Sequence, residues 1–437
     1  MLLVFSSMFF KINLRYNSFV INRIAFAFQN YSLKMTLLKA LLKITNSKIL
    51  QYICSMLFSS ILGQDYIKNH LLKSALTGRI PHAQLFVGPE GSGTLAMAIA
   101  YAQFVLCLNQ DQENTGGNEN CNLKFQSLTH PDLHFVYPNV TNEDVKTKPK
   151  SADFIADWRE FVLNNPYASL FDWYKHLGVQ NKQGEIRVED AQDILKSLAL
   201  KSFEGGYKIM IVWMADKMNI AASNKLLKLL EEPPEKTLFL LITENEEDII
   251  QTIRSRCQVL NFSALPEAVI KKELIEKYFL DDASASKVAH QAQGNYNKAL
   301  HIVKNDTTDF PFEKWFVAWV RAAFSAKKNA SAIQDLILWS EEIASLGREG
   351  QKQFLNYCIE MFRQALLQNY ETKKLVYLEP SAENFSIQKF SPFVNGNNIN
   401  AIFNELSDAI YHIERNGNAK IILTDLSIKL TRLIHKN

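Results

Sequence analysis

The sequence predicts an α/β fold built on a parallel sheet of five strands, followed by regions that are entirely helical. Five short runs rich in apolar residues lie among segments with helical spacing, at Ala83–Val87, Asp132–Tyr137, Ile209–Met214, Leu238–Ile242 and Val259–Phe262. Such runs between helices are typical of buried strands in a parallel sheet. From Ala264 onward the apolar residues follow only helical periodicity.

The length and composition fit a soluble protein of two or three domains, with 437 residues, 47% hydrophobic and 21% charged. The net charge of +3 is concentrated in residues 1–55, which hold basic but no acidic side chains. The rest of the chain is mildly acidic, so charge gives no argument for strong DNA binding by the chain alone. No apolar segment is long enough to span a bilayer. Five scattered cysteines predict a reducing cytoplasm rather than a disulfide framework.

The stretch Lys208–Phe262 carries the most specific pattern in the chain. A helix is predicted over Ile220–Glu232, and Pro233 and Pro234 end it because proline lacks an amide proton. The sequence AASNKLLKLLEEPPEKTLFLLIT, followed by TIRSRCQ, resembles the clamp-loader branch of the AAA+ proteins. The likeness covers roughly Leu57–Leu300.

This resemblance implies an AAA+ (P-loop NTPase-like) sheet with helices on both faces, then a small helical lid and a helical collar through which subunits form a ring. The expected domains are an extension at 1–55, an α/β domain at 56–263 with an insertion at about 138–185, a lid at 264–309 and a collar at 310–437. The collar carries apolar residues in stripes along its helices, among them Trp315, Trp319, Phe324, Phe354, Phe362, Leu423 and Ile428.

The segment after the first strand has the glycines of a phosphate-binding loop but lacks its catalytic groups. Gly88 and Gly93 have the spacing that lets backbone amides wrap phosphates. Thr94 stands in place of the lysine, and Leu95 in place of the hydroxyl residue that binds magnesium. Electrostatic stabilisation of phosphoryl transfer would therefore be lost. We predict a vestigial nucleotide site, with weak binding through the backbone amides left open.

A second group needed for ATP hydrolysis is missing at the end of the third predicted strand. Asp216 matches the carboxylate that holds magnesium in ATPases, but Lys217 stands where a glutamate activates water. Thr243, at the end of the next strand, occupies the position of a γ-phosphate sensor in active relatives, or it only caps the strand. Two independent losses predict an inactive ATPase with no cofactor and no metal of its own.

Ser255-Arg256-Cys257 lies just before the last strand and is intact. The resemblance implies that Arg256, with Ser255 beside it, reaches into the ATP–magnesium site of a neighbouring subunit. Arginine suits this role because it is always charged and offers a planar fork to phosphate oxygens. A finger supplied in trans accelerates phosphoryl transfer by about 10³–10⁵-fold. The alternative is a surface ion pair of Arg256 with Glu244 or Glu246. Arg254 is the lesser candidate.

Relatives in this family place four cysteines for zinc before a His-Pro-Asp phrase. This chain has only Cys107 and Cys121 in that window, and the spacing of His130 and His134 does not replace the missing pair. A structural zinc site needs four ligands, so no zinc is predicted. Cys107 is then a small apolar residue at a helix end.

The insertion at 138–185 combines Lys146, Lys148 and Lys150 with many aromatic residues. Basic and aromatic side chains together can bind single-stranded nucleic acid by stacking. The alternative is a pair of helices, at Phe154–Val162 and Ser169–Leu177, whose aromatic residues pack on the core. The helical spacing favours the second interpretation.

Two further positions bear on the resemblance. In the predicted lid, Lys298 holds the place nearest to an arginine that reads nucleotide in relatives, and lysine lacks the bidentate fork. At the other end of the chain, Met56 opens a phrase similar to the usual start of the family. Residues 1–55 are then expected to be a disordered tail or absent from the native protein, with a transit peptide or a membrane-surface helix as the alternative.

The resulting hypothesis is a non-hydrolysing subunit of the bacterial DNA polymerase III clamp loader, without polymerase or ATPase activity of its own. Its implied partners are ATPase subunits of tau/gamma type and a delta-type subunit in a cytoplasmic ring. Through that complex it would serve the sliding clamp and primed DNA, with no membrane partner. The alternatives are an active AAA+ ATPase with an atypical loop, either clamp-loading or branch-migrating, and a nucleic-acid-binding module acting through the insertion.

Overall fold

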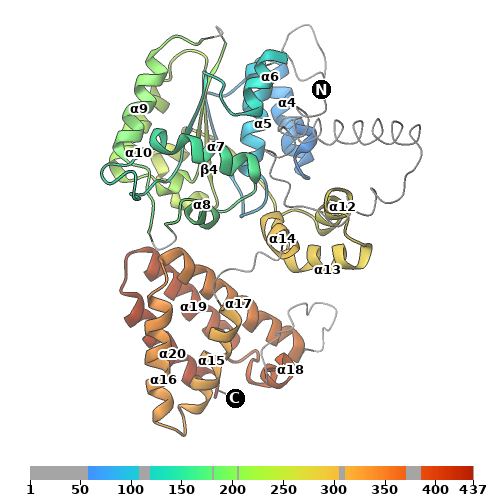
Figure 1. The fold of residues 1–437 in the computed structure, drawn as a ribbon, viewed down its shortest axis with the longest axis vertical. Helices are drawn as coiled ribbons and strands as arrows, with labels where there is room; N and C mark the ends of the chain where they lie inside the picture. Colours follow the sequence, from blue (N-terminus) through green and yellow to red (C-terminus); the bar gives the residue numbers. More distant parts are fainter. Residues whose placement is uncertain are drawn as a thin grey trace, which may run out of the picture. The chain divides into compact units, whose positions relative to one another are not determined.

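A parallel sheet forms the centre of the α/β region in the computed structural model (Figure 1). Its strands lie in the order β2-β3-β4-β1-β5, and every neighbouring pair is parallel. The predicted five-stranded fold is therefore confirmed. The bounds are β1 (Ala83–Val87), β2 (Leu133–Val136), β3 (Lys208–Val212), β4 (Thr237–Thr243) and β5 (Gln258–Asn261).

The structure describes residues 58–107, 119–179, 182–203, 206–304, 311–370 and 385–436. The predicted extension at 1–55 and the predicted start at Met56 lie outside the described residues. Among the helices of the described part, none is long and apolar enough to cross a membrane.

Helices cover both faces of the sheet (Figure 1) because successive strand residues point to opposite sides. Along β4, Leu238, Leu240 and Ile242 face one core, whereas Phe239 and Leu241 face the other. The first core is covered by α4 (Asp65–Leu76), α5 (Thr94–Cys107) and α6 (Glu119–Gln126), and the second by α9 (Val188–Ala199), α10 (Ile220–Glu231) and the short α11 (Gln251–Arg254).

Local sequence explains where α10 begins and ends. The side chain of Asn219 accepts a hydrogen bond from the Ala222 amide and so caps the first turn. Leu226 and Leu230 are buried against the sheet. The helix ends at Glu231, two residues before the Pro233-Pro234 pair that cannot continue it.

The insertion contains two helices, α7 (Ile155–Asn164) and α8 (Leu170–His176), preceded by the 3-10 turn η2 (Ser151–Phe154). Its aromatic residues are buried. Trp158 is stacked on Tyr137 with ring centroids 4.0 Å apart, and the indole of Trp173 donates a 2.8 Å hydrogen bond to the carbonyl of Pro138. Both tryptophans are 0% exposed, so the aromatic residues are part of the core and do not form a stacking platform.

Helices follow the sheet, as predicted. The first group packs on the α/β core and comprises α12 (Glu267–Tyr278), α13 (Asp282–Ala292) and α14 (Tyr296–Val303). The remaining helices enclose a separate hydrophobic core, distinct from the two cores on the faces of the sheet. It holds the stacked rings of Trp319 and Trp339, with centroids 4.8 Å apart. Two predicted members of its apolar stripes are not buried, Phe324 and Ile428, which are 43% and 46% exposed. The helices of this region are α15 (Phe312–Ser325), α16 (Ser331–Ala344), α17 (Arg348–Asn369), α18 (Ile387–Phe390), α19 (Ile399–Glu414) and α20 (Ala419–Leu433).

Cys107 and Cys121 form a disulfide, which the sequence did not predict. The two residues lie at the end of α5 and at the start of α6, with their Cα atoms 5.5 Å apart. The interpretation of Cys107 as an unbonded apolar residue was therefore wrong. An odd number of cysteines did not exclude one bonded pair between adjacent helices.

Candidate functional site

The glycine loop connects β1 to α5, as the phosphate-loop pattern predicts. The Gly88 amide donates a 3.2 Å hydrogen bond to the carbonyl of Thr243, so the loop is fixed to the end of β4. Gly93 has a φ of +91°, a conformation that L side chains rarely adopt. Thr94 begins α5 directly after it.

Tyr167, from the insertion, covers this loop. A Cβ atom added to Gly93 would lie only 2.8 Å from the Tyr167 ring. The tyrosine hydroxyl accepts a 2.9 Å hydrogen bond from the Leu62 amide, and its ring packs edge-on against Tyr296 at 5.0 Å. Burial raises the pKa of Tyr167, which is therefore neutral. The surface of the loop that would face phosphates thus faces an aromatic ring.

The start of α14 covers the other side of the same loop. The Tyr296 amide donates a 3.3 Å hydrogen bond to the carbonyl of Gly91. The side-chain amides of Asn295 and Asn297 donate to the Glu90 carboxylate at 3.1 and 3.3 Å. Burial raises the pKa of Glu90, and these two hydrogen bonds oppose that effect.

An ion pair joins α8 to α14 beside these contacts. His301 Nε2 lies 3.0 Å from the Asp172 carboxylate, which also accepts a 2.7 Å hydrogen bond from Asn297. Burial works against the charge of Asp172, but His301 and Ser169 outweigh it and hold the pKa of Asp172 at about 2. The lid helix, the insertion and the loop are thereby connected by one polar network.

The space left beside the loop is about 20 Å³. That volume holds about one water molecule, whereas small-molecule sites usually have about 300–1,000 Å³. Its lining includes Gly88, Gly93, Thr94, Tyr167, Trp213 and Thr243. The residues present, in this arrangement, do not fit a bound nucleotide.

Both carboxylate oxygens of Asp216 contact neighbouring side chains. Lys217 Nζ lies 2.7 Å from one carboxylate oxygen, and the Thr243 hydroxyl lies 3.1 Å from the other. The same hydroxyl is 3.0 Å from the carbonyl of Asn245, so its single proton serves one of the two acceptors. Burial opposes the charge of Lys217, but Asp216 outweighs it and raises the pKa of Lys217. A lysine held as a cation cannot take a proton from water.

Arg256 lies at the outer edge of the sheet, just before β5. Its guanidinium donates hydrogen bonds to the Thr252 carbonyl at 2.9 Å and to Glu231 at 2.7 Å. The Ser255 hydroxyl is 3.4 Å away. The ion pair expected as the alternative exists, but with Glu231 rather than with Glu244 or Glu246.

Arg254 and Cys257 flank this arginine and differ from it in their surroundings. Arg254 contacts Gln251 at 2.6 Å and Glu246 at 3.8 Å, on its own side of the loop. Burial raises the pKa of Cys257 to about 12, so its thiol is not reactive near neutral pH. In the lid, burial lowers the pKa of Lys298, the predicted nucleotide-reading position.

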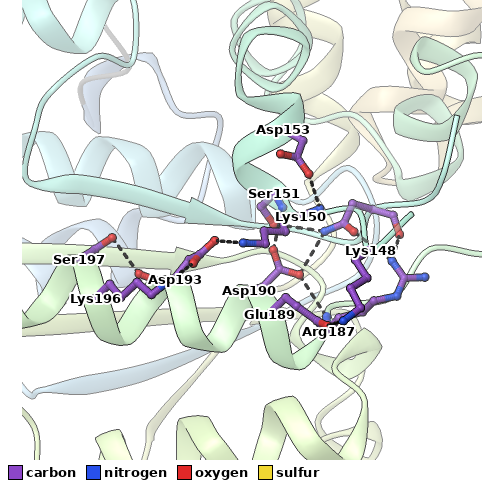
Figure 2. Close-up of polar contacts among 11 residues, drawn as sticks. Lys148, Lys150, Ser151, Asp153, Arg187, Glu189, Asp190, Asp193, Lys196 and Ser197 are labelled. Carbon is purple, nitrogen blue, oxygen red and sulfur yellow. Dashed lines mark hydrogen bonds and ion pairs between the residues drawn. The ribbon is translucent and has the colours of Figure 1, made fainter. Parts of the chain in front are cut away.

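The lysines of the insertion face carboxylates of α9 (Figure 2). Lys150 lies 3.1 Å from Asp193, and Lys148 lies 3.9 Å from Glu189. Between them, Asp190 accepts hydrogen bonds from the backbone amides of Ser151 and Arg187, at 2.7 and 3.1 Å. Both lysines therefore attach the insertion to the α/β core, and their charges are partly neutralised. These contacts, with the buried aromatic residues, favour the interpretation of the insertion as a helical pair packed on the core.

The predicted zinc window offers no set of ligands among the described residues, where no group of three or more His, Cys, Asp or Glu side chains is arranged around a common point. Cys107 and Cys121 are bonded to each other. The His130 ring nitrogen accepts a hydrogen bond from the Asp132 amide at 3.2 Å. These residues do not fit a structural zinc ion.

Sequence comparison relates this module to replication proteins. Residues 63–266 match the family model described as DNA polymerase III, delta subunit. Over 245 residues the chain is 29% identical to the delta' subunit of DNA polymerase III from Bacillus subtilis, covering 56% of this chain and 60% of that protein.

Through its α/β module, the chain resembles the delta' subunits of DNA polymerase III.

The chain is also similar to other proteins. The chain is 28% identical to the tau subunit from Bacillus subtilis over 251 residues, which are 56% of this chain and 37% of that subunit. A gamma subunit-related protein from Thermotoga maritima has a TM-score of 0.37 at 13% identity, covering 84% of this chain and 99% of that one. The chain thus spans 60% and 37% of the length of these two curated relatives.

Several residues of the site carried no signal in the sequence. Tyr167 was one aromatic residue among many in the insertion, and Asn295 and Asn297 stood in a phrase from which only Lys298 was selected. The one available signal was Asn295 directly after the helix-breaking Gly294, a residue type that often caps a helix start. Glu231 lies in the phrase LLKLLEEPP and Arg256 in the separate phrase TIRSRCQ, so nothing in the sequence paired the two residues.

Proposed function

We propose that this chain is a delta'-type subunit of a DNA polymerase III clamp loader that hydrolyses no ATP and donates Arg256 to ATP on a neighbouring subunit. The observation that carries the proposal is an asymmetry within one module. Side chains of the chain itself fill the nucleotide side, whereas Arg256 lies at an exposed edge with 36% of its side chain accessible.

Two contacts and one missing residue support the absence of a nucleotide cofactor. Tyr167 covers Gly93, Lys217 neutralises Asp216, and no lysine follows Gly93 to meet outer phosphates. Each removes a different requirement of phosphoryl transfer, namely space, magnesium coordination and charge stabilisation. Restoring one of them would leave the other two missing.

The partners follow from the role of the relatives. An arginine finger needs an ATP site on another chain, and the tau and tau/gamma proteins among the relatives are the natural suppliers of that site. Together with a delta-type subunit they would form a ring that loads the sliding clamp onto primed DNA. Such a ring works on chromosomal DNA in the cytoplasm.

The test is a reconstituted ring containing either the wild-type chain or Arg256→Ala. We expect the variant to assemble but to lower DNA-stimulated ATP hydrolysis, because the site it serves loses a stabilising contribution of about 10³–10⁵-fold. Unchanged hydrolysis and unchanged clamp loading would refute the assignment.

A further inference from the structure

We infer that Glu231 is the positioning residue of Arg256: it holds the guanidinium in the free subunit and competes for it with the phosphates of the neighbour's ATP. This inference rests on the proposed function and names how that site is regulated. Arg256 would then bind the neighbour's ATP only where the charge of the phosphates is strong enough to displace the Glu231 carboxylate.

The two residues are fixed on one rigid base. Glu231 is the last residue of α10, next to Leu230, which is 2% exposed. Arg256 follows α11, whose Ile253 is 0% exposed. Leu230 and Ile253 belong to the same hydrophobic core beneath the sheet. Core packing therefore sets the distance between the backbones of Glu231 and Arg256, so the two side chains extend from fixed positions.

The guanidinium is oriented by contacts on two sides. One terminal nitrogen donates to the Thr252 carbonyl at 2.9 Å, and the other donates to Glu231 Oε1 at 2.7 Å. The carbonyl contact comes from α11, four residues before Arg256, and can persist in a complex. The Glu231 contact is the one with a charged partner, and it occupies the other terminal nitrogen.

The location of Glu231 is unfavourable for the helix alone. The C-terminal end of a helix carries partial negative charge, and a carboxylate there is destabilising unless a cation compensates it. Arg256 supplies that cation. Local helix stability therefore does not explain a glutamate at this position, whereas pairing with Arg256 does.

The exchange with phosphate costs little. The side chains of Arg256 and Glu231 are 36% and 44% exposed, and exposed ion pairs contribute only weakly to stability. An ATP phosphate group carries more negative charge than one carboxylate and would sit in a subunit interface that excludes water, where attraction is stronger. The arginine is thus held well enough to be oriented and weakly enough to be released.

Glu231→Gln tests the inference because it removes the charge and keeps the shape at an exposed position. In the free chain, Arg256 of this variant should react with phenylglyoxal about two- to fivefold faster than in the wild type, read by peptide mass spectrometry. Glu246→Gln, which alters the 3.8 Å pair of Arg254, is the matched control and should leave the Arg256 rate unchanged. Equal Arg256 rates in Glu231→Gln and wild type would overturn the pairing.

In the reconstituted ring, Glu231→Gln should lower the ATP concentration for half-maximal hydrolysis by about two- to fivefold and leave kcat unchanged, since a competitor has been removed. A fall in kcat without that shift would mean that Glu231 only supports the arginine, which contradicts competition. If Arg256→Ala impairs the ring but Glu231→Gln does not shift half-saturation, this inference fails alone. If Arg256→Ala has no effect, the proposed function fails, and the phenylglyoxal result still reports on the pair.

Discussion

Tyr167 lies over Gly93, so that an aromatic ring from the insertion occupies the place where a phosphate loop would meet its ligand. The tyrosine is 8% exposed and its hydroxyl is held by the Leu62 amide at 2.9 Å. The burial of the ring and the hydrogen bond to its hydroxyl hold Tyr167 in place over the loop.

The purified chain should therefore show no saturable, magnesium-dependent binding of ATP at concentrations up to about 1 mM. A dissociation constant of about 1 mM corresponds to only about 4 kcal/mol of binding free energy. Isothermal titration calorimetry measures this directly. Tyr167→Ala should open the loop without producing hydrolysis, because Thr94 and Lys217 are unchanged. Micromolar binding by the wild type, with turnover, would show that the site works despite its sequence.

Lys217→Met should lower the free energy of unfolding by about 2–4 kcal/mol, because it leaves the Asp216 carboxylate buried without its cation. Asp216 is 8% exposed and lies 2.7 Å from the lysine. The double variant Asp216→Asn/Lys217→Met should recover most of the loss, since neither member of the pair then carries a charge. Urea denaturation of the three proteins measures both effects, and a Lys217→Met protein as stable as the wild type would refute the pairing.

The Asp172–His301 pair predicts a dependence of stability on pH. The pKa of Asp172 is lowered to about 2 in the folded state, so the carboxylate stabilises the fold above its ordinary pKa and that contribution is lost as pH falls toward 2. Asp172→Asn should cost about 2 kcal/mol at pH 7 and about half of that at pH 3. Chemical denaturation at both pH values measures the difference, and a cost independent of pH would contradict this origin.

The insertion should behave as part of the core. Trp158→Ala should cost about 3–5 kcal/mol, the usual range for removing a large buried aromatic side chain. Lys150→Gln, from the same insertion, should cost far less because its ion pair with Asp193 is near the surface. Thermal or urea denaturation of both variants compares them. Equal, small losses would show that the insertion is not packed as observed.

Much of this fold was accessible from the sequence because it depends on local pattern. Short runs rich in apolar residues predicted all five strands, and the proline pair after Glu232 predicted the end of α10 within one residue. The adjacency of Asp216 and Lys217 also follows directly from the order of residues. Each of these features is set by a pattern of residues that lie close together in the sequence.

The contacts that cover the loop could not be predicted in the same way. Tyr167 and Asn295 reach the glycine loop only because the insertion and the lid pack on the same core, a long-range result with no periodic signature. The choice of Glu231 over Glu246 as the partner of Arg256 depends on the packing of Leu230 and Ile253 beneath the sheet. The disulfide likewise depends on how α5 and α6 meet.

The most direct measurement is the DNA-stimulated ATPase of a reconstituted ring in which only this subunit varies among wild type, Arg256→Ala and Arg254→Ala. Arg254 is the matched control, since it has the same charge, lies two residues away and pairs with Gln251 and Glu246 instead. We predict that Arg256→Ala lowers hydrolysis at the site it serves by at least about tenfold, with assembly intact, whereas Arg254→Ala leaves it near wild type. Full hydrolysis with Arg256→Ala in an assembled ring would contradict the account.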